Sequence, residues 1–179
     1  MSYKSGNPRK IVSLGGTFDV LHKGHKEYIR MGFAYAEYAL IYVLSDNYAR
    51  NLKKYHVRSY DSRVKRLCNF LEKAGVTTNQ YEIRGINSLS HLERELVNEN
   101  ITVSIVVPEY LDLFHDINQK RLLNKKDSIV VVRKKRTVDP KLGDLSSTAI
   151  RFPACIFEYI PQTTVRKITN NQINSPIMR

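Results

Sequence analysis

The feature that most constrains the fold is an alternation of short apolar runs with segments whose apolar residues recur at helical spacing. Five of the runs have the length and the β-branched or aliphatic residues typical of strands, namely 11–14, 39–44, 81–84, 101–107 and 128–132. This repeated strand–helix order predicts an α/β fold with one five-stranded parallel sheet, helices on both of its faces and right-handed crossovers. In such a sheet, ligands bind beyond the carboxyl ends of the strands, where the strand order reverses.

The helices are predicted from apolar spacing and from residues that begin or end a helix. Leu21 opens the first helix, whose apolar face also carries Tyr28, Ile29, Phe33 and Ala36. The basic and polar segment 47–60 is expected to be a loop. Asp61 or Ser62 then caps a helix that ends at Gly75. The remaining helices are expected to begin at Ser88 or Ser90, at Glu109 and at Ser146.

The length of 179 residues fits one domain, and with 42% hydrophobic residues the chain can form its own core. A chain of this length buries roughly 70% of its unfolded surface, so it needs neither disulfides nor a structural metal to fold. Composition changes near the end: residues 152–179 hold three of the six prolines and none of the eight glycines. We therefore expect a single domain over 1–151 and a C-terminal extension over 152–179, which either packs partly on the surface or binds a partner.

An excess of positive charge points to an anionic partner. Lys and Arg total 29 against 17 Asp and Glu, which gives a formal net charge of +12. Nucleic acid, an anionic membrane and phosphorylated small molecules all fit that charge. The most basic stretch, 120–136, contains the run Arg133–Arg136 (RKKR), for which a solvated or phosphate-steering role is favoured over nucleic-acid binding or nuclear import.

No feature of the sequence predicts export or membrane insertion. The longest apolar run, Tyr38–Leu44, has seven residues, whereas a membrane-spanning helix needs about 20. The basic, polar start of the chain has no apolar stretch of the kind a secretory signal carries. Two cysteines, Cys68 and Cys155, are too few for a disulfide framework or a zinc ribbon. A reducing, cytoplasmic setting is therefore expected.

The junction between the first strand and the first helix carries the most chemistry. It reads GGTFDVLHKGH from Gly15 to His25. Glycines there let the backbone approach a ligand, and the helix N-terminus adds a partial positive charge, so the junction suits a phosphate group. His22 and His25 are three residues apart and share one face of the first helical turn, with the Thr17 hydroxyl on the same side. These groups donate to phosphate oxygens and include no obvious pair of nucleophile and base.

Other interpretations of this junction stay open. The two histidines could ligate zinc, although no third Cys or His lies near them in the sequence. Gly15 and Gly16 could form a turn and nothing more, and Asp19 could be a turn or cap residue. Phosphate binding is the leading interpretation.

Two segments resemble the motifs of the HxGH nucleotidyltransferase superfamily. His22–His25 matches HxGH after Thr17-Phe18-Asp19, and Leu145–Arg151 (LSSTAIR) is similar to the superfamily's ISSTxIR. HxGH alone is moderately specific, whereas both motifs at opposite ends of a five-strand chain are far more so. The second motif is another helix start, with three hydroxyls and an arginine that suit a phosphate. The resemblance implies the superfamily's Rossmann-like fold.

Within the superfamily, the chain most resembles phosphopantetheine adenylyltransferases of the archaeal and eukaryotic type. The resemblance rests on the double glycine at Gly15, on Ser45–Ala49 (SDNYA), on Arg63 and on Ile117–Arg121 (INQKR), and it spans roughly residues 11–151. It implies transfer of an adenylyl group from ATP to 4′-phosphopantetheine, which yields dephospho-coenzyme A and pyrophosphate in coenzyme A biosynthesis.

The sequence also departs from that pattern. Pro108 stands where a serine is typical, and Gly85–Ser88 (GINS) replaces a DPYG-like segment. Arg136-Thr137 before the second motif resembles the RTxGIST pattern of cytidylyltransferases that use CTP with glycerol, choline or ethanolamine phosphate. Those enzymes are the alternative. A nucleotide- or RNA-binding protein that kept the fold without the activity is a third possibility, disfavoured because both phosphate motifs are intact.

The resemblance implies roles for individual residues. His22, His25 and Thr17 would be catalytic, with His22 nearest the reacting α-phosphate. The nucleotide would be held by a larger set: Gly15, Gly16, Phe18, Asp19, Gly24, Ser146, Ser147, Thr148, Arg151 and Arg121. The acceptor would be bound by Thr17, Arg50, Lys53, Arg63 and Lys120. Lys54 and Arg58 are further candidates for the acceptor phosphate.

The implied partners are a nucleoside triphosphate and a phosphorylated small molecule, with no membrane and with nucleic acid disfavoured. Mg²⁺ would arrive with the nucleotide, bridging its phosphates and keeping water ligands, so no metal-ligating protein residue is assigned. Oligomeric state stays open.

Overall fold

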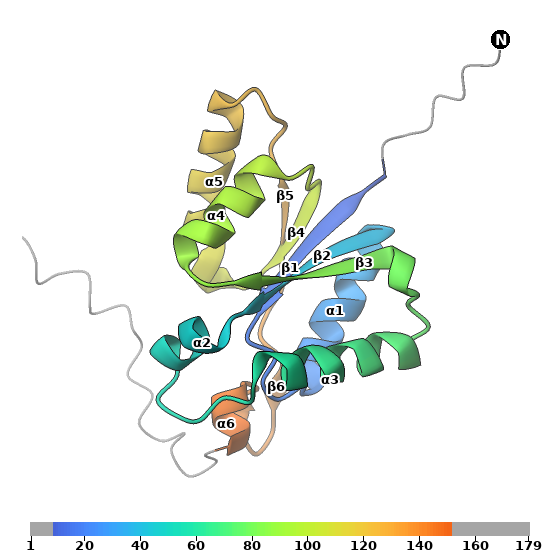
Figure 1. The fold of residues 1–179 in the computed structure, drawn as a ribbon, viewed down its shortest axis with the longest axis vertical. Helices are drawn as coiled ribbons and strands as arrows, with labels where there is room; N and C mark the ends of the chain where they lie inside the picture. The colour runs from blue at the N-terminus through green and yellow to red at the C-terminus, as the bar shows by residue number, and fades with distance from the viewer. Residues whose placement is uncertain (1–8, 152–179) are drawn as a thin grey trace, which may run out of the picture.

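A five-stranded sheet runs through the middle of the protein in the computed structural model, which describes residues 9–151. Its strands are β1 (Ile11–Gly16), β2 (Tyr38–Leu44), β3 (Tyr81–Ile86), β4 (Val103–Val106) and β5 (Val130–Arg133). They lie in the order β3-β2-β1-β4-β5, and every neighbouring pair is parallel. The predicted α/β fold with a parallel sheet is therefore confirmed (Figure 1).

Helices cover both faces of this sheet. The four long ones are α1 (Lys23–Tyr35), α3 (Tyr60–Lys73), α4 (Leu89–Asn98) and α5 (Leu111–Leu123). α1 and α3 pack on one face and α4 and α5 on the other, so that two apolar cores form. Residues of β2 alternate between them: Ile41 belongs to the core under α1 and α3, and Tyr42 to the core under α4 and α5. That alternation explains why β2 is apolar throughout.

The strand order reverses next to β1. From β1 the chain adds β2 and then β3 on one side, and it then crosses to β4 and β5 on the other side. The helices that leave β1 and β4 therefore turn to opposite faces of the sheet. Sheets with this order bind ligands in the crevice beyond the carboxyl ends of two such strands, so this edge is the candidate ligand crevice. A pair of buried hydroxyls, Ser13 and Ser104, hydrogen-bonds between β1 and β4 at this central seam.

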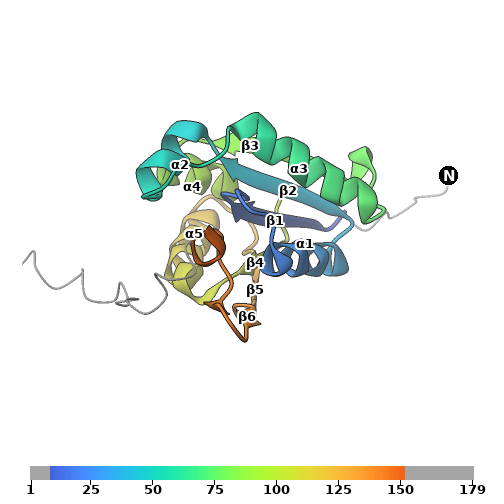
Figure 2. The ribbon, with the colours of Figure 1, turned by 90° about the horizontal axis from the view of Figure 1, so that it is seen from below.

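Four short elements lie at the carboxyl end of the sheet (Figure 2). They are α2 (Asp46–Leu52), the antiparallel pair β6 (Val138–Asp139) and β7 (Gly143–Asp144), and α6 (Ser147–Arg151). The β6–β7 turn forms because the Asp139 carboxylate accepts hydrogen bonds from the backbone N–H groups of Lys141 and Leu142, at 2.9 and 3.1 Å. Two turns of 3₁₀ helix, Thr78–Gln80 and Pro108–Tyr110, precede β3 and α5.

The structure corrects the prediction of a loop over 47–60. Residues 46–52 form α2, whose N-terminus is capped by the Ser45 hydroxyl accepting from the Tyr48 N–H at 3.3 Å. Ala49 is the buried residue of α2, so the helix carries no apolar periodicity from which it could be predicted. The next helix is capped by Ser59 rather than by Asp61 or Ser62.

The predicted boundary after residue 151 stays a prediction, because 152–179, with Cys155, lie outside the described residues. Within 9–151, no helix is both long and apolar enough to cross a membrane.

Arg121 lies at the amino end of the sheet, opposite the crevice, and this corrects its assignment to a nucleotide. Arg121 is 3% exposed, and its guanidinium donates to the carbonyl oxygens of Leu96, Val97, Glu99, Ile101 and Asp127 at 2.7–3.3 Å. It thus satisfies the last carbonyls of α4 and the chain entering β4 and β5. Burial lowers the pKa of Arg121. Lys120, its neighbour on α5, is exposed and pairs with Glu93 of α4 at 2.8 Å, also away from the crevice.

We expect Arg121→Ala to lower the free energy of unfolding by about 3 kcal/mol, because several buried carbonyls lose their donor. For a domain of this size, that corresponds to a fall in Tm of roughly 6–12 °C in a calorimetric scan. Lys120→Ala is the matched control and should change Tm by less than about 2 °C, since an exposed ion pair contributes little. Equal Tm values for the two variants would contradict the structural role of Arg121.

Candidate active site

The loop that leaves β1 makes a tight turn at the carboxyl end of the sheet. Phe18 adopts a left-handed backbone conformation (φ 51°) and its ring is 1% exposed. A Cβ on Gly16 would lie 3.2 Å from that ring, a tight contact that would push the Phe18 ring by a few tenths of an ångström, so glycine suits this close approach. The turn carries the chain into α1, whose N-cap residue is His22. The strained turn therefore sets the entry angle of the histidine segment.

His22 and His25 stack against each other at this helix start. Their ring centroids are 3.9 Å apart, and the Phe18 ring lies 5.2 Å from that of His25. Nδ1 of His25 is 2.9 Å from the carbonyl oxygen of Val20. Because a carbonyl only accepts, Nδ1 carries the proton, and Nε2 of a neutral His25 is then an acceptor. Nδ1 of His22 is buried without a hydrogen-bond partner among the described residues.

Both imidazoles are neutral near pH 7. Burial, followed by the neighbouring His25 and Lys134, lowers the pKa of His22 to about 4. Burial also lowers the pKa of His25 to about 4, with further lowering by Lys53 and Lys134, while the bond to the Val20 carbonyl opposes the shift. Near pH 7 these two histidines would therefore gain a proton only if an anion came close.

Gly24 lets the segment after β5 pack against the histidines. A Cβ at Gly24 would lie 3.1 Å from the His22 ring and 3.2 Å from Oγ1 of Thr137. Thr137 donates to the carboxylate of Glu27 on α1, and its hydroxyl also accepts from the Lys134 ammonium at 3.0 Å. These contacts place the segment that follows β5 against the start of α1.

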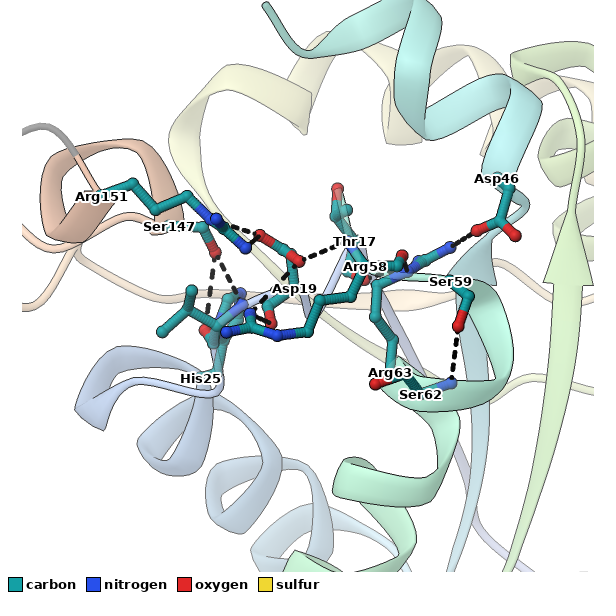
Figure 3. A network of polar contacts seen from close by, with 11 residues as sticks. Thr17, Asp19, His25, Asp46, Arg58, Ser59, Ser62, Arg63, Ser147 and Arg151 are labelled. Carbon is teal, nitrogen blue, oxygen red and sulfur yellow. Dashed lines mark hydrogen bonds and ion pairs between the residues drawn. The ribbon is translucent and has the colours of Figure 1, made fainter. Parts of the chain in front are cut away.

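The carboxylate of Asp19 connects three separate segments (Figure 3). Asp19 is 0% exposed. Its Oδ2 lies 2.8 Å from both Nε and Nη2 of Arg151 in α6, and its Oδ1 accepts from the Arg58 backbone N–H at 3.0 Å. The Arg58 guanidinium donates to the Asp19 carbonyl oxygen at 2.8 Å. Two nitrogens of Arg151 thus converge on one carboxylate oxygen, and such charge-assisted contacts are strong. Asp19 therefore holds the second motif against the first.

Of the three hydroxyl-bearing residues in the second motif, two hydrogen-bond to the backbone and one is exposed. Ser147 is 8% exposed, and its hydroxyl lies 3.3 Å from the N–H and 3.5 Å from the carbonyl oxygen of Val20. Ser146 caps α6 by accepting from the Ala149 N–H at 3.0 Å. Thr148 is exposed, next to Tyr55, whose ring centre lies 5.2 Å from the Arg151 guanidinium.

Arg63 is fully buried beneath the loop rather than open to a ligand. Its guanidinium donates to the carbonyl oxygens of Thr17 and Arg58 at 2.8 and 2.9 Å and pairs with the Asp46 carboxylate at 2.9 Å (Figure 3). With three partners already in place, Arg63 positions the Thr17 turn. The expectation of direct acceptor binding by Arg63 is corrected to this supporting role.

The remaining basic candidates occupy different places. Lys53, the C-cap of α2, is half-buried, and burial together with Arg136 lowers its pKa. Lys53 also acts electrostatically on His25, so it faces the same crevice. Arg50 is exposed and donates to the Asn47 side chain at 2.5 Å.

Sequence reasoning noted Lys134 only within the basic run Arg133–Arg136 and Thr137 only in the cytidylyltransferase-like pattern, and it placed neither beside the histidines. It missed the pairing of Asp46 with Arg63. One signal was available for Lys134: it lies two residues after the fifth predicted strand, 128–132, at the edge where ligands bind. Among residues 9–151, no three His, Cys, Asp or Glu side chains cluster in a way that could hold a metal ion. The donors that do gather at the crevice are N–H and O–H groups and cations, which suit the oxygens of a phosphorylated ligand.

The sheet order and the crevice define the class: a doubly wound α/β protein with its candidate ligand site at the switch point. A model of the Cytidylyltransferase-like family matches residues 13–152, which include both motif segments. The chain therefore belongs to this family of nucleotidyltransferases.

Several curated relatives are similar over most of the chain. A phosphopantetheine adenylyltransferase of Thermococcus gammatolerans is 33% identical over 147 residues, which cover 80% of this chain and 89% of that protein. A bifunctional phosphopantetheine adenylyltransferase/NTP phosphatase of Thermoplasma volcanium is 30% identical over 143 residues, and this chain spans 41% of its length. A crystal structure of a protein of unknown function from Archaeoglobus fulgidus superposes with a TM-score of 0.59 at 28% identity, covering 69% of this chain and 87% of that one.

We expect stability to fall as the pH drops from about 6.5 to 4. The unfolded chain protonates histidine near pH 6.5, whereas folded His22 and His25 protonate near pH 4. Between these values the unfolded state binds more protons, so acid favours unfolding. Urea titrations at pH 7, 6, 5 and 4 should show this slope reduced in His25→Asn.

The matched control is His115→Asn, which changes an exposed histidine on α5. Its free energy of unfolding should follow the parent's dependence on pH. Identical slopes for His25→Asn and the parent would mean that His25 is not buried in its neutral form.

Proposed function

We propose that the protein transfers the adenylyl group of ATP to 4′-phosphopantetheine, giving dephospho-coenzyme A and pyrophosphate. The observation that carries the proposal is the junction of the two motifs: the histidine pair at the start of α1 is held against α6 by Asp19 and Arg151. The choice of substrates is supported by relatives named phosphopantetheine adenylyltransferase, of which one is 33% identical over 89% of its length.

In the proposed reaction, an acceptor phosphate oxygen attacks the α-phosphorus of the nucleotide, and the bond to the leaving pyrophosphate breaks. The acceptor phosphate is largely a dianion near neutral pH, so no general base is needed. Catalysis then rests on positioning and on stabilising the negative charge of the transition state. Mg²⁺ would arrive bound to the nucleotide substrate and would neutralise part of the phosphate charge.

The histidines would contact the triphosphate, with His22 nearest the α-phosphate and Thr17 between nucleotide and acceptor. Since Nδ1 of His25 is engaged by the Val20 carbonyl, Nε2 can donate to a phosphate oxygen only in the protonated ring. The approaching polyanion would raise the pKa of His25 from about 4. Nucleotide binding would thus be coupled to proton uptake at this ring.

The second motif would hold the outer phosphates through Ser146, Thr148 and Arg151, with Ser147 fastened to the Val20 backbone. Two nitrogens of Arg151 face Asp19, which leaves Nη1 for a phosphate oxygen. The oxygens of Asp19 already accept hydrogen bonds from its arginine partners. Asp19 would therefore act as a positioning residue. The acceptor phosphate would lie toward Arg50, on α2, and Lys53, the C-cap of that helix.

A cytidylyltransferase acting on a small phosphate ester is the second candidate. It is favoured by Arg136-Thr137 before the second motif and by the description of the matching family. In the structure, however, Arg136 pairs with Glu109 and approaches Asp144, while Thr137 binds Glu27. Both side chains are therefore engaged within the protein. The cytoplasmic setting and the choice of partners remain predictions.

We expect the pair of ATP and 4′-phosphopantetheine to give the highest kcat/KM in a pyrophosphate-release assay. The panel should cross ATP and CTP with 4′-phosphopantetheine, glycerol phosphate, choline phosphate and ethanolamine phosphate. A tenfold preference for a CTP pair, equal to about 1.4 kcal/mol in the transition state, would favour the second candidate. Nucleotide or RNA binding without turnover of any pair would favour a non-catalytic protein.

We also expect His22→Ala to lower kcat by about 10²–10³-fold with a smaller change in the KM for nucleotide, because charge builds on the α-phosphate only in the transition state. Steady-state kinetics at saturating substrates measure this split. His115→Ala, on the exposed face of α5, is the control and should keep the parent's kcat. A folded His22→Ala enzyme with normal kcat would remove His22 from the mechanism.

A further inference from the structure

We propose that Lys134, which follows β5, is a further phosphate-binding residue of the crevice, held beside the histidines by the contact between Thr137 and Glu27. This inference rests on the proposed function and names a cation that the two motif segments do not contain.

The backbone fixes Lys134 at the carboxyl edge of the sheet. Its N–H donates to the carbonyl oxygen of Val106, the last residue of β4, at 2.8 Å. β4 is the strand next to β1 at the switch point. The side chain therefore starts from the same edge as the β1–α1 loop and cannot reach the helix faces where Lys120 and Arg121 lie.

The side chain then turns toward the start of α1. Nζ of Lys134 lies 3.0 Å from Oγ1 of Thr137. That Oγ1 and the His22 ring both lie within 3.2 Å of one point, the position that a Cβ on Gly24 would take. The ammonium is thus one hydrogen bond away from a group that packs beside His22. The lowering of both histidine pKa values by Lys134 is consistent with this proximity.

Thr137 is anchored so that Lys134 keeps this place. Its hydroxyl donates to the Glu27 carboxylate, and its carbonyl oxygen accepts from the Leu145 N–H at 2.8 Å. The bond from Thr137, ahead of nearby Lys134 and Lys23, lowers the pKa of Glu27. Glu27 therefore stays ionised and holds the exit of β5 against α1.

The charge of Lys134 is only partly compensated. Its side chain is 13% exposed and forms an ion pair with Glu27, whose Oε2 lies 3.7 Å from Nζ and also accepts a hydrogen bond from Thr137. Its hydrogen-bond acceptors are neutral: the Thr137 hydroxyl and the Lys135 carbonyl oxygen, both at 3.0 Å. The carboxylate partner of this largely buried ammonium is 3.7 Å away and is shared with Thr137, so the positive charge is incompletely balanced. An anion entering the crevice would therefore be attracted to it.

The chemistry of the site calls for such a cation. Two histidines with pKa values of about 4 carry no charge at pH 7, yet the proposed substrate is a polyanion. Lys134 supplies a positive charge that is present before the nucleotide binds. The other members of the basic run do not: Arg133 and Lys135 are exposed, and Arg136 is paired with Glu109.

The test compares Lys134→Met with Lys135→Met by titrating inorganic tripolyphosphate and, separately, a non-hydrolysable ATP analogue in a calorimeter. We expect Lys134→Met to raise Kd for both at least tenfold, with a shallower dependence on salt because one phosphate contact is lost. Lys135→Met should bind like the parent. Lys134→Gln, which can still hydrogen-bond to Thr137, should show the same loss of affinity if the Met variant is unstable.

Histidine titration by NMR without ligand provides a second readout. Lys134→Met should raise the pKa of His22 and His25, whereas Lys135→Met should leave both unchanged. Unaltered tripolyphosphate affinity in Lys134→Met and Lys134→Gln overturns the proposal, even if the histidine pKa values shift. A parent protein that binds neither tripolyphosphate nor the ATP analogue overturns the proposed function and this inference together, which distinguishes the two failures.

Discussion

The geometry of the crevice depends on one buried carboxylate. Asp19 is fully buried and is bound by Arg58, 39 residues away, and by Arg151, 132 residues away. Removing a carboxylate from water costs several kcal/mol unless charged and hydrogen-bonding partners replace the water. Both arginines must therefore be in place for the β1–α1 loop to adopt its turn. The turn of the first motif and the docking of the second are therefore coupled through Asp19, which explains how two short segments from opposite ends of the domain come to share a site.

A second consequence concerns charge. The turn that Asp19 stabilises buries the two histidines against Phe18 and against each other, and burial makes them neutral. A site for a polyanion would then attract its ligand through residues outside the histidine segment. Lys134 follows β5, and Lys53 follows α2, the helix that comes after β2. In the sheet, β5 and β2 lie on opposite sides of β1. Both lysines act electrostatically on His25. The buried, neutral histidines and the lysines that attract an anion therefore come from different elements of the fold.

The arginines show where reasoning from sequence stops. Arg63, Arg121 and Arg151 all lie at helix positions where a phosphate contact was plausible. Arg121 instead binds five backbone carbonyls at the far end of the sheet, and Arg63 binds two carbonyls and Asp46 beneath the loop. A guanidinium has five N–H donors and satisfies carbonyls or a carboxylate as readily as a phosphate. The presence of an arginine in the sequence therefore does not predict whether it binds carbonyls, a carboxylate or a phosphate. The same limit applies to α2, since a short helix with one buried residue leaves no periodic pattern.

The sequence by itself determined the sheet, its parallel strands and the location of the ligand-suited loop. Local alternation of strand and helix periods, with right-handed crossovers, allows few other arrangements, and the motif at Gly15–His25 follows directly from where β1 ends. Only the tertiary structure decided which charges remain available at the crevice. That outcome depends on distances between segments far apart in the chain. Asp19 pairs with Arg151, and Asp46 pairs with Arg63. Glu27 binds Thr137, and Thr137 in turn places Lys134 beside the histidines. Pairing of charges is a property of three-dimensional proximity and desolvation, and no local pattern encodes it.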